Sequence, residues 1–151
     1  MQAILPVSAA DASRPSRTPS SKASVEAAPV MRAVRQRRVL LVEDNLDTVR
    51  SFALLLREMG HQVEYAINGY AGLEVARRFR PEVIFLDLGL PGMDGFELCR
   101  AFKRDPVLKQ ARVIAVTGYA QEDFRTRSRE AGCELHLVKP VNSDVVRQLL
   151  E

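Results

Sequence analysis

The sequence predicts an α/β fold: a doubly wound, five-stranded parallel sheet with strand order 2-1-3-4-5 and helices on both faces. Strand-like and helix-like segments alternate five times, which is the pattern of a parallel sheet with helical crossovers. Three strand-like segments, 39–42, 83–86 and 113–116, are continuous apolar runs typical of strands covered on both faces. Segment 62–66 alternates polar and apolar residues, which favours an edge position.

Local signals define the remaining elements in order. After the first strand, Val49, Phe52, Ala53 and Leu56 recur near one helical face, and Gly60 is a natural residue to end that helix. The later expected elements are helices at 71–79, 96–103 and 122–131, a strand at 135–138, and a short helix beginning at Ser143 or Asp144. This is the flavodoxin-like arrangement, in which ligands bind beyond the carboxyl ends of the strands where the strand order reverses.

The charge is unevenly distributed along the 151 residues. Residues 1–38 hold seven basic and two acidic side chains, whereas the remainder holds 15 basic and 17 acidic ones. Residues 1–36 are rich in Ala, Ser, Pro and Arg without periodicity, so we expect a disordered basic tail or linker before a folded domain at 37–151. Met31 is an alternative translational start. The mildly acidic body argues against direct nucleic-acid binding.

Neither a membrane span nor a secretory signal is expected. No apolar run approaches the roughly 20 residues that a span needs, and the first ten residues lack an early positive charge and a sustained apolar core. Cys99 and Cys133 show no disulfide pattern, so we expect reduced, buried structural thiols and a cytoplasmic location.

Charged and hydroxyl residues follow the central strands. Glu43 and Asp44 end the first strand, and Asp87 ends the third. Thr117 ends the fourth strand and Lys139 the fifth. Because the carboxyl ends of parallel strands share one edge of the sheet, these side chains are expected to converge at one crevice.

Such a cluster is suited to phosphoryl chemistry. Three carboxylates without Cys or His ligands select a hard cation, and Mg²⁺ fits best. A carboxylate beside Mg²⁺ can attack phosphorus to form an acyl phosphate, with Lys139 and Thr117 to neutralise and bind the phosphoryl oxygens. Singly, Asp44 or Asp47 could instead be a helix N-cap, and Lys139 an ordinary surface lysine.

Four segments together resemble bacterial response-regulator receiver domains. They are 39–45 (Val-Leu-Leu-Val-Glu-Asp-Asn), 87–95 (Asp-Leu-Gly-Leu-Pro-Gly-Met-Asp-Gly), 116–118 (Val-Thr-Gly) and 138–140 (Val-Lys-Pro). The resemblance covers about residues 37–151.

The resemblance implies a role for each matching position. Asp87 would accept the phosphoryl group from a histidine kinase or a histidine phosphotransfer protein. Asp44 and Asp87 would ligate Mg²⁺, with Glu43 assisting and Gly89 offering its backbone carbonyl. The domain would then catalyse only its own phosphorylation and dephosphorylation.

The switch and the output surface are also implied by resemblance. Thr117 and Lys139 would bind the phosphoryl group, and Lys139-Pro140 would be a cis peptide. His136 stands where the family usually carries Tyr or Phe, and it either turns inward with Thr117 or stays on the strand surface. The helix at 122–131, the strand at 135–138 and the last helix would dock a downstream partner or form a homodimer. Phe124, Val145 and Val146 are either contacts on that surface or residues of the core.

Other functions fit less well. Similar aspartyl-phosphate phosphatases need a second Asp where this chain has Gly89, and a flavin phosphate would be repelled by Glu43 and Asp44. A non-phosphorylated scaffold that only binds proteins remains the main alternative. The chain is either a stand-alone receiver or the receiver piece of a hybrid histidine kinase.

Overall fold

The computed structural model describes residues 35–118 and 122–151. The expectations about a disordered tail and about Met31 concern residues that lie outside this described part, apart from residues 35 and 36, which form neither helix nor strand. Within the two described ranges, no helix is long and apolar enough to cross a membrane.

Five parallel strands form one sheet in the order β2-β1-β3-β4-β5. The strands are β1 (Arg38–Val42), β2 (Gln62–Ala66), β3 (Val83–Asp87), β4 (Arg112–Thr117) and β5 (Leu135–Val138). This confirms the predicted fold and the edge position of β2. In the register, Val42 lies between Ala66 and Leu86, and Asp87 lies opposite Val116, so the strand ends that carry the predicted site residues are level.

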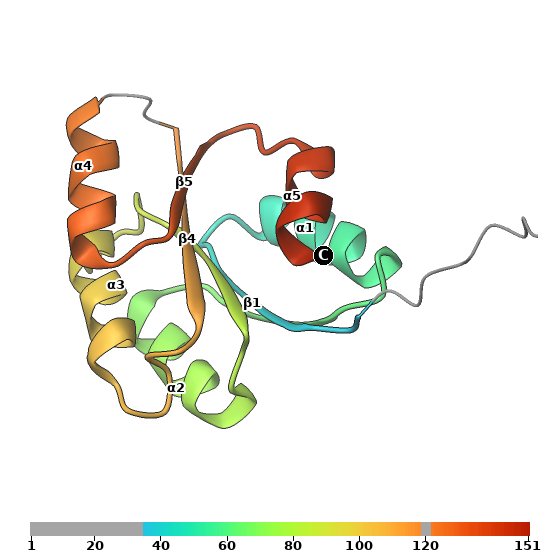
Figure 1. Ribbon diagram of the computed structural model, residues 1–151, viewed down its shortest axis with the longest axis horizontal. Helices are drawn as coiled ribbons and strands as arrows, with labels where there is room; N and C mark the ends of the chain where they lie inside the picture. Colours follow the sequence, from blue (N-terminus) through green and yellow to red (C-terminus); the bar gives the residue numbers. More distant parts are fainter. Residues whose placement is uncertain (1–34, 119–121) are drawn as a thin grey trace, which may run out of the picture. The chain divides into compact units, whose positions relative to one another are not determined.

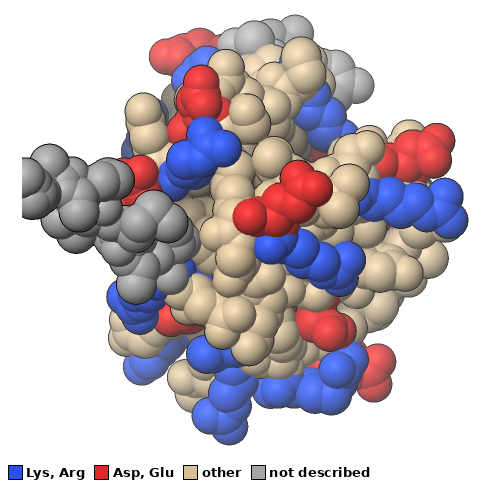
Figure 2. Space-filling view, turned by 90° about the vertical axis from the view of Figure 1, so that its right-hand side faces the viewer, with Lys and Arg blue, Asp and Glu red and all other residues tan. Residues whose placement is uncertain are grey.

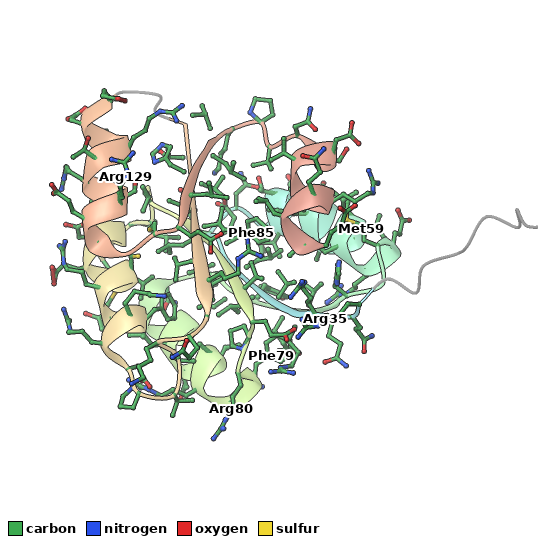
Figure 3. All side chains as sticks on the ribbon, in the orientation of Figure 1. Arg35, Met59, Phe79, Arg80, Phe85 and Arg129 are labelled. Atoms are coloured by element: carbon green, nitrogen blue, oxygen red, sulfur yellow. The ribbon has the colours of Figure 1, made fainter. Side chains whose placement is uncertain are left out.

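Helices cover both faces of the sheet. They are α1 (Leu46–Glu58), α2 (Gly69–Phe79), α3 (Gly95–Arg104), α4 (Glu122–Ala131) and α5 (Ser143–Leu150). Figure 1 shows α1 and α5 on one side of the sheet and α2, α3 and α4 on the other. Each side has its own apolar core. Phe85, labelled in Figure 3, belongs to the core under α1 and α5, whereas Phe102 belongs to the other.

The helix ends explain why the site residues are available. Asn45, and neither Asp44 nor Asp47, is the N-cap of α1, because its side chain accepts the backbone N–H of Thr48 at 3.0 Å. The carboxylate of Asp44 is therefore not used to cap the helix. At the other end, Gly60 adopts φ +99°, the left-handed conformation expected where the helix stops.

Arg37 connects the start of β1 with the end of α5. Its Nε donates to the carbonyl of Leu150 at 2.6 Å, and its Nη2 donates to the carbonyl of Glu151 at 2.7 Å. The backbone N–H of Arg37 also donates to Nδ1 of His61 at 3.1 Å. These bonds hold the two ends of the described domain together at one edge.

Candidate functional site

Three carboxylates meet at the carboxyl ends of β1 and β3. Glu43 and Asp44 directly follow β1, and Asp87 is the last residue of β3. One carboxylate oxygen from each lies within 4.8 Å of the others. Glu43 and Asp87 are buried, at 7% and 8% exposure, whereas Asp44 is exposed. The carboxylates predicted to converge are therefore brought together, with one side of the cluster open to solvent.

Lys139 brings the single ammonium group of the cluster. Its Nζ lies 2.9 Å from Oε2 of Glu43 and 3.2 Å from Oδ2 of Asp87. The backbone fixes this position, because the N–H of Lys139 donates to the carbonyl of Thr117 at 2.8 Å. The peptide bond from Lys139 to Pro140 is cis, as the resemblance to receiver domains implied. Three carboxylates thus share one cation, and the cluster carries excess negative charge.

The electrostatics of the cluster reflect this crowding. Burial raises the pKa of Glu43, and the nearby Asp87 charge adds to the effect, although the hydrogen bonds from Lys139 and from the Asn45 N–H oppose it. Burial lowers the pKa of Lys139, but the hydrogen bonds and charges of Glu43 and Asp87 outweigh this and raise the pKa overall. Lys139 therefore stays charged, and an added cation would relieve the remaining repulsion.

The loop after Asp87 is hydrogen-bonded to the Asp87 carboxylate. The N–H of Gly89 donates to Oδ1 of Asp87 at 2.8 Å, which orients that carboxylate. Gly95 begins α3 in close contact with this loop, because a Cβ there would lie 2.7 Å from Cα of Leu88. Gly89 itself is under less steric demand, since an added Cβ would make only a 3.4 Å contact with Asp87. The loop therefore approaches Asp87 through backbone atoms.

The predicted switch residues lie on β4 and β5. Thr117 is buried at the end of β4 and pairs in register with Val138. His136 is half-buried, and its Nδ1 lies 2.9 Å from Oγ of Ser128 on α4. The same hydroxyl donates to the carbonyl of Phe124 at 2.7 Å, so Ser128 connects His136 to the backbone of α4. His136 is thus joined to α4 and is not an isolated strand-surface residue.

A cavity of about 620 Å³ adjoins the acidic cluster. It reaches Glu43, Asp87 and Lys139 and continues between α1 and the segment 140–146. Its walls are mostly apolar and include Phe52 and Leu55 of α1. The helical period of the sequence placed Phe52 near the core face, and no sequence signal indicated that space remains beside it, because the spacing of α1 and α5 depends on tertiary packing.

The predicted output contacts need one correction. Val146 is fully buried in the core under α5, so the expectation that it contacts a partner is wrong. Its position follows from the apolar face of α5, which the sequence analysis had already allowed to be core. Val145 is 38% exposed. Phe124 is half-buried, and its ring centroid lies 5.8 Å from that of Phe96 on α3.

Comparisons with known proteins agree with this fold and site. Residues 39–151 match the sequence profile of the response regulator receiver domain. The polar-differentiation response regulator DivK of Brucella anthropi is 36% identical over 104 residues, which cover 69% of this chain and 85% of that protein. The chain therefore belongs to the response regulator receiver domain family, whose members transmit signals in two-component systems.

Solved structures of receiver domains superpose closely. Vibrio cholerae chemotaxis protein CheY4 has a TM-score of 0.72 at 27% identity, covering 77% of this chain and 97% of that one. The receiver domain of sensor histidine kinase PA1611 from Pseudomonas aeruginosa has a TM-score of 0.70 at 28% identity, covering 77% of this chain and 95% of that one. That domain was crystallised with a magnesium ion coordinated in its active site cleft.

Proposed function

We propose that the domain is the phosphoacceptor of a two-component phosphorelay, with Asp87 as the residue that becomes phosphorylated. The donor would be a phosphohistidine on a sensor histidine kinase or on a histidine phosphotransfer protein. One observation carries the proposal: the carboxylate of Asp87 is buried among two further carboxylates and lies 3.2 Å from the ammonium of Lys139. A carboxylate in such surroundings can act as a nucleophile whose product is neutralised where it forms.

The donor set fits Mg²⁺. Glu43, Asp44 and Asp87 provide only oxygen ligands and excess negative charge, and Asp44 leaves the cluster open to solvent. In the proposal Asp44 and Asp87 hold the ion, Glu43 assists, and the backbone carbonyl of Gly89 completes the protein ligands. When bound, Mg²⁺ supplies neutralisation of the negative charge that builds up on the phosphoryl oxygens.

The protein's own residues account for the transfer step. A carboxylate oxygen of Asp87 attacks phosphorus while the bond from phosphorus to the donor imidazole nitrogen breaks, so one phosphoryl group moves and the histidine is released. The N–H of Gly89 holds the other carboxylate oxygen and thereby orients the attacking one. Before transfer, the ammonium of Lys139 donates hydrogen bonds to both Glu43 and Asp87. After transfer, it pairs with the new phosphoryl oxygens. The domain acts on no separate substrate.

The response is proposed to run from Thr117 to His136. If Thr117 binds the phosphoryl group, the end of β4 shifts beside β5, where His136 is hydrogen-bonded to Ser128 of α4. This bond supports a connection from the site to α4. The surface made by α4, β5 and α5 would then bind a downstream partner or a second copy of the domain. In this proposal residues 37–151 form the signalling domain and residues 1–36 are a tail or linker.

Phosphorylation by a small-molecule donor tests the proposal directly. The protein is incubated with Mg²⁺ and acetyl phosphate and weighed by intact mass spectrometry. Wild type should gain about 80 Da, and Asp87→Asn should not. Asp47→Asn is the matched control, because Asp47 lies on the rim of the neighbouring cavity with its side chain 95% exposed, and it should still be labelled. No adduct on any variant would favour the non-phosphorylated scaffold.

A further inference from the structure

The two cysteines of the chain are neighbours in space. Cys99 lies within α3, and Cys133 lies in the turn between α4 and β5. Their Sγ atoms are 2.9 Å apart, although 34 positions separate them in sequence. Cys99 is fully buried, Cys133 is 5% exposed, and both are free thiols. The sequence predicts two buried thiols, and both side chains are buried, but it does not predict that they touch.

The end of α4 fixes the position of Cys133. Gly132 has φ +106°, and its N–H donates to the carbonyl of Arg129. The N–H of Cys133 donates to the carbonyl of Ser128 at 2.9 Å. These two bonds form a Schellman motif, whose last residue usually turns its side chain back toward the helix. Cys133 accordingly joins the core that contains Cys99.

The hydrogen bond between the two thiols changes the pKa of each in the opposite direction. The hydrogen bond with Cys133 lowers the pKa of Cys99, and the positive charges of Lys103 and Arg100 act in the same direction against the opposing effect of burial. The same hydrogen bond, together with burial, raises the pKa of Cys133. The pair therefore loses one proton, from Cys99, more readily than a lone buried thiol does, and Cys133 holds the remaining proton in the hydrogen bond between the two sulfurs.

A surface cavity is lined by one of the two cysteines. The cavity measures about 150 Å³ and is lined by Cys133 together with His136 and Arg129, which is labelled on α4 in Figure 3. A water molecule occupies about 30 Å³ in the liquid, so a molecule as small as a hydroperoxide fits. Cys99 does not line this cavity. An oxidant entering here therefore meets Cys133 first.

We propose that Cys99 and Cys133 are an oxidation site, at which a hydroperoxide converts the two thiols into an intramolecular disulfide that joins α3 to the turn after α4. In the first step Cys133 passes its proton to the thiolate of Cys99 across the hydrogen bond and attacks the peroxide, the O–O bond breaks, and Cys133 becomes a sulfenic acid while an alcohol or water leaves. In the second step Cys99 attacks the sulfur of Cys133, the S–O bond breaks, and water leaves. Two thiols and one hydroperoxide thus give one disulfide and two small oxygen products.

The oxidised form is suited to a reducing compartment only as a transient state. Disulfides of cytosolic proteins are usually redox-sensing or catalytic and are reversed by the thiol systems of the cell. The site lies apart from Asp87, because the two cysteines belong to the core under α3 and α4. The oxidation of the two thiols therefore does not use the Asp87 carboxylate.

Thiol counting on the full chain tests the proposal. The folded protein is treated with hydrogen peroxide, quenched, denatured and alkylated with a maleimide. Wild type should lose both reactive thiols together, lose about 2 Da before alkylation, stay monomeric on a non-reducing gel, and recover both thiols with dithiothreitol. Two thiols that stay alkylatable, or a disulfide-linked dimer, would overturn the proposal. Asp87→Asn should behave like wild type, which separates this test from that of the phosphoacceptor.

Single-cysteine variants test the order of attack. In Cys99→Ala, Cys133 should stop at the sulfenic acid and be trapped by dimedone. In Cys133→Ala, Cys99 should stay unmodified in the folded protein, because it does not line the cavity. Circular dichroism establishes that each variant is folded before the peroxide is added. Oxidation of Cys99 in Cys133→Ala as fast as in wild type would contradict Cys133 as the point of entry.

Discussion

At the amino ends of the strands two ion pairs each join one basic and one acidic side chain, whereas at the carboxyl ends three carboxylates lie around one ammonium. Arg112 at the start of β4 makes two hydrogen bonds of 2.9 Å to the carboxylate of Glu134, which precedes β5. Glu82, just before β3, pairs similarly with Arg35 at 3.1 Å. Each of these four side chains has a partner of opposite charge within hydrogen-bonding distance.

The carboxyl ends differ in the balance of charge and in burial. Glu43 and Asp87 are each about 10% exposed in their side chains and have only Lys139 between them, with Asp44 close by. Elsewhere on the surface, Figure 2 shows basic and acidic side chains interspersed over one face of the molecule. Charged residues alone therefore do not indicate a site in this domain. The informative feature is a group of negatively charged side chains that lie close together and are partly buried.

The largest expected difference between the two ends is their response to Mg²⁺. At a hundredfold excess over its dissociation constant, Mg²⁺ should raise the free energy of unfolding of wild type by about 2.7 kcal/mol, because it binds only the folded cluster. Asp44→Asn should lose most of this stabilisation. The measurement is urea unfolding with Mg²⁺ and with a chelator. Glu134→Gln at the opposite end is the control and should keep the full effect; equal stabilisation of Asp44→Asn would contradict the assignment.

A smaller effect is expected from removing the ammonium. Lys139→Met should lower the free energy of unfolding by about 1–2 kcal/mol without Mg²⁺, because Glu43 and Asp87 then repel each other unpaired. Breaking a fully buried pair costs about 3–5 kcal/mol, and the Lys139 side chain is 34% exposed, so water screens part of that cost. Lys109→Met, at an exposed position, is the control. Unchanged stability of Lys139→Met would show that the carboxylates do not repel.

The smallest effect is expected at the amino ends. Arg112 and Glu134 should show a coupling energy of about 0.5–1 kcal/mol near neutral pH in a double-mutant cycle of Arg112→Met and Glu134→Gln. The hydrogen bond from Arg112 lowers the pKa of Glu134 below its ordinary 4.5. This stability is therefore present above that value and is lost as the pH falls through the folded-state pKa. A coupling that persists in acid would contradict the lowered pKa.

At the carboxyl ends of the strands, the free energy of unfolding should change with pH in the opposite direction. The pKa of Glu43 is raised above its ordinary 4.5, so its ionisation costs stability as the pH rises from that value through the folded-state pKa. In chelator, Glu43→Gln should remove this loss from the pH profile of unfolding, and Glu134→Gln should not. This comparison sets the two ends of the sheet against each other in a single titration.

The parts of the fold that could be predicted depend on local pattern. The apolar runs at 39–42, 83–86 and 113–116 each became a buried strand of the sheet. The strand order then followed from which runs were continuous and which alternated. Because strand ends are level in a parallel sheet, Asp87 and Lys139 could be brought to one place without any knowledge of side-chain packing.

The parts that could not be predicted depend on helix rotation and packing. The contact between Cys99 and Cys133 requires a particular placement of α3 beside the end of α4, which helical periodicity does not determine. The N-cap at Asn45 was missed because Asp44 and Asp47 satisfy the same sequence rule. The hydrogen bond between His136 and Ser128 joins β5 to α4, and it depends on how α4 is oriented against the strand. The spacing of residues in the sequence does not determine that orientation.

The bonds of Arg37 have a consequence for how this domain can be rearranged. Because one side chain holds the carbonyls of Leu150 and Glu151 at the start of β1, the first and last described residues leave the domain from the same edge. Domains of this kind tolerate circular permutation. A short linker from residue 151 to residue 35 would close the chain into a ring, and new ends could be opened in a distant surface turn while every strand keeps its neighbours.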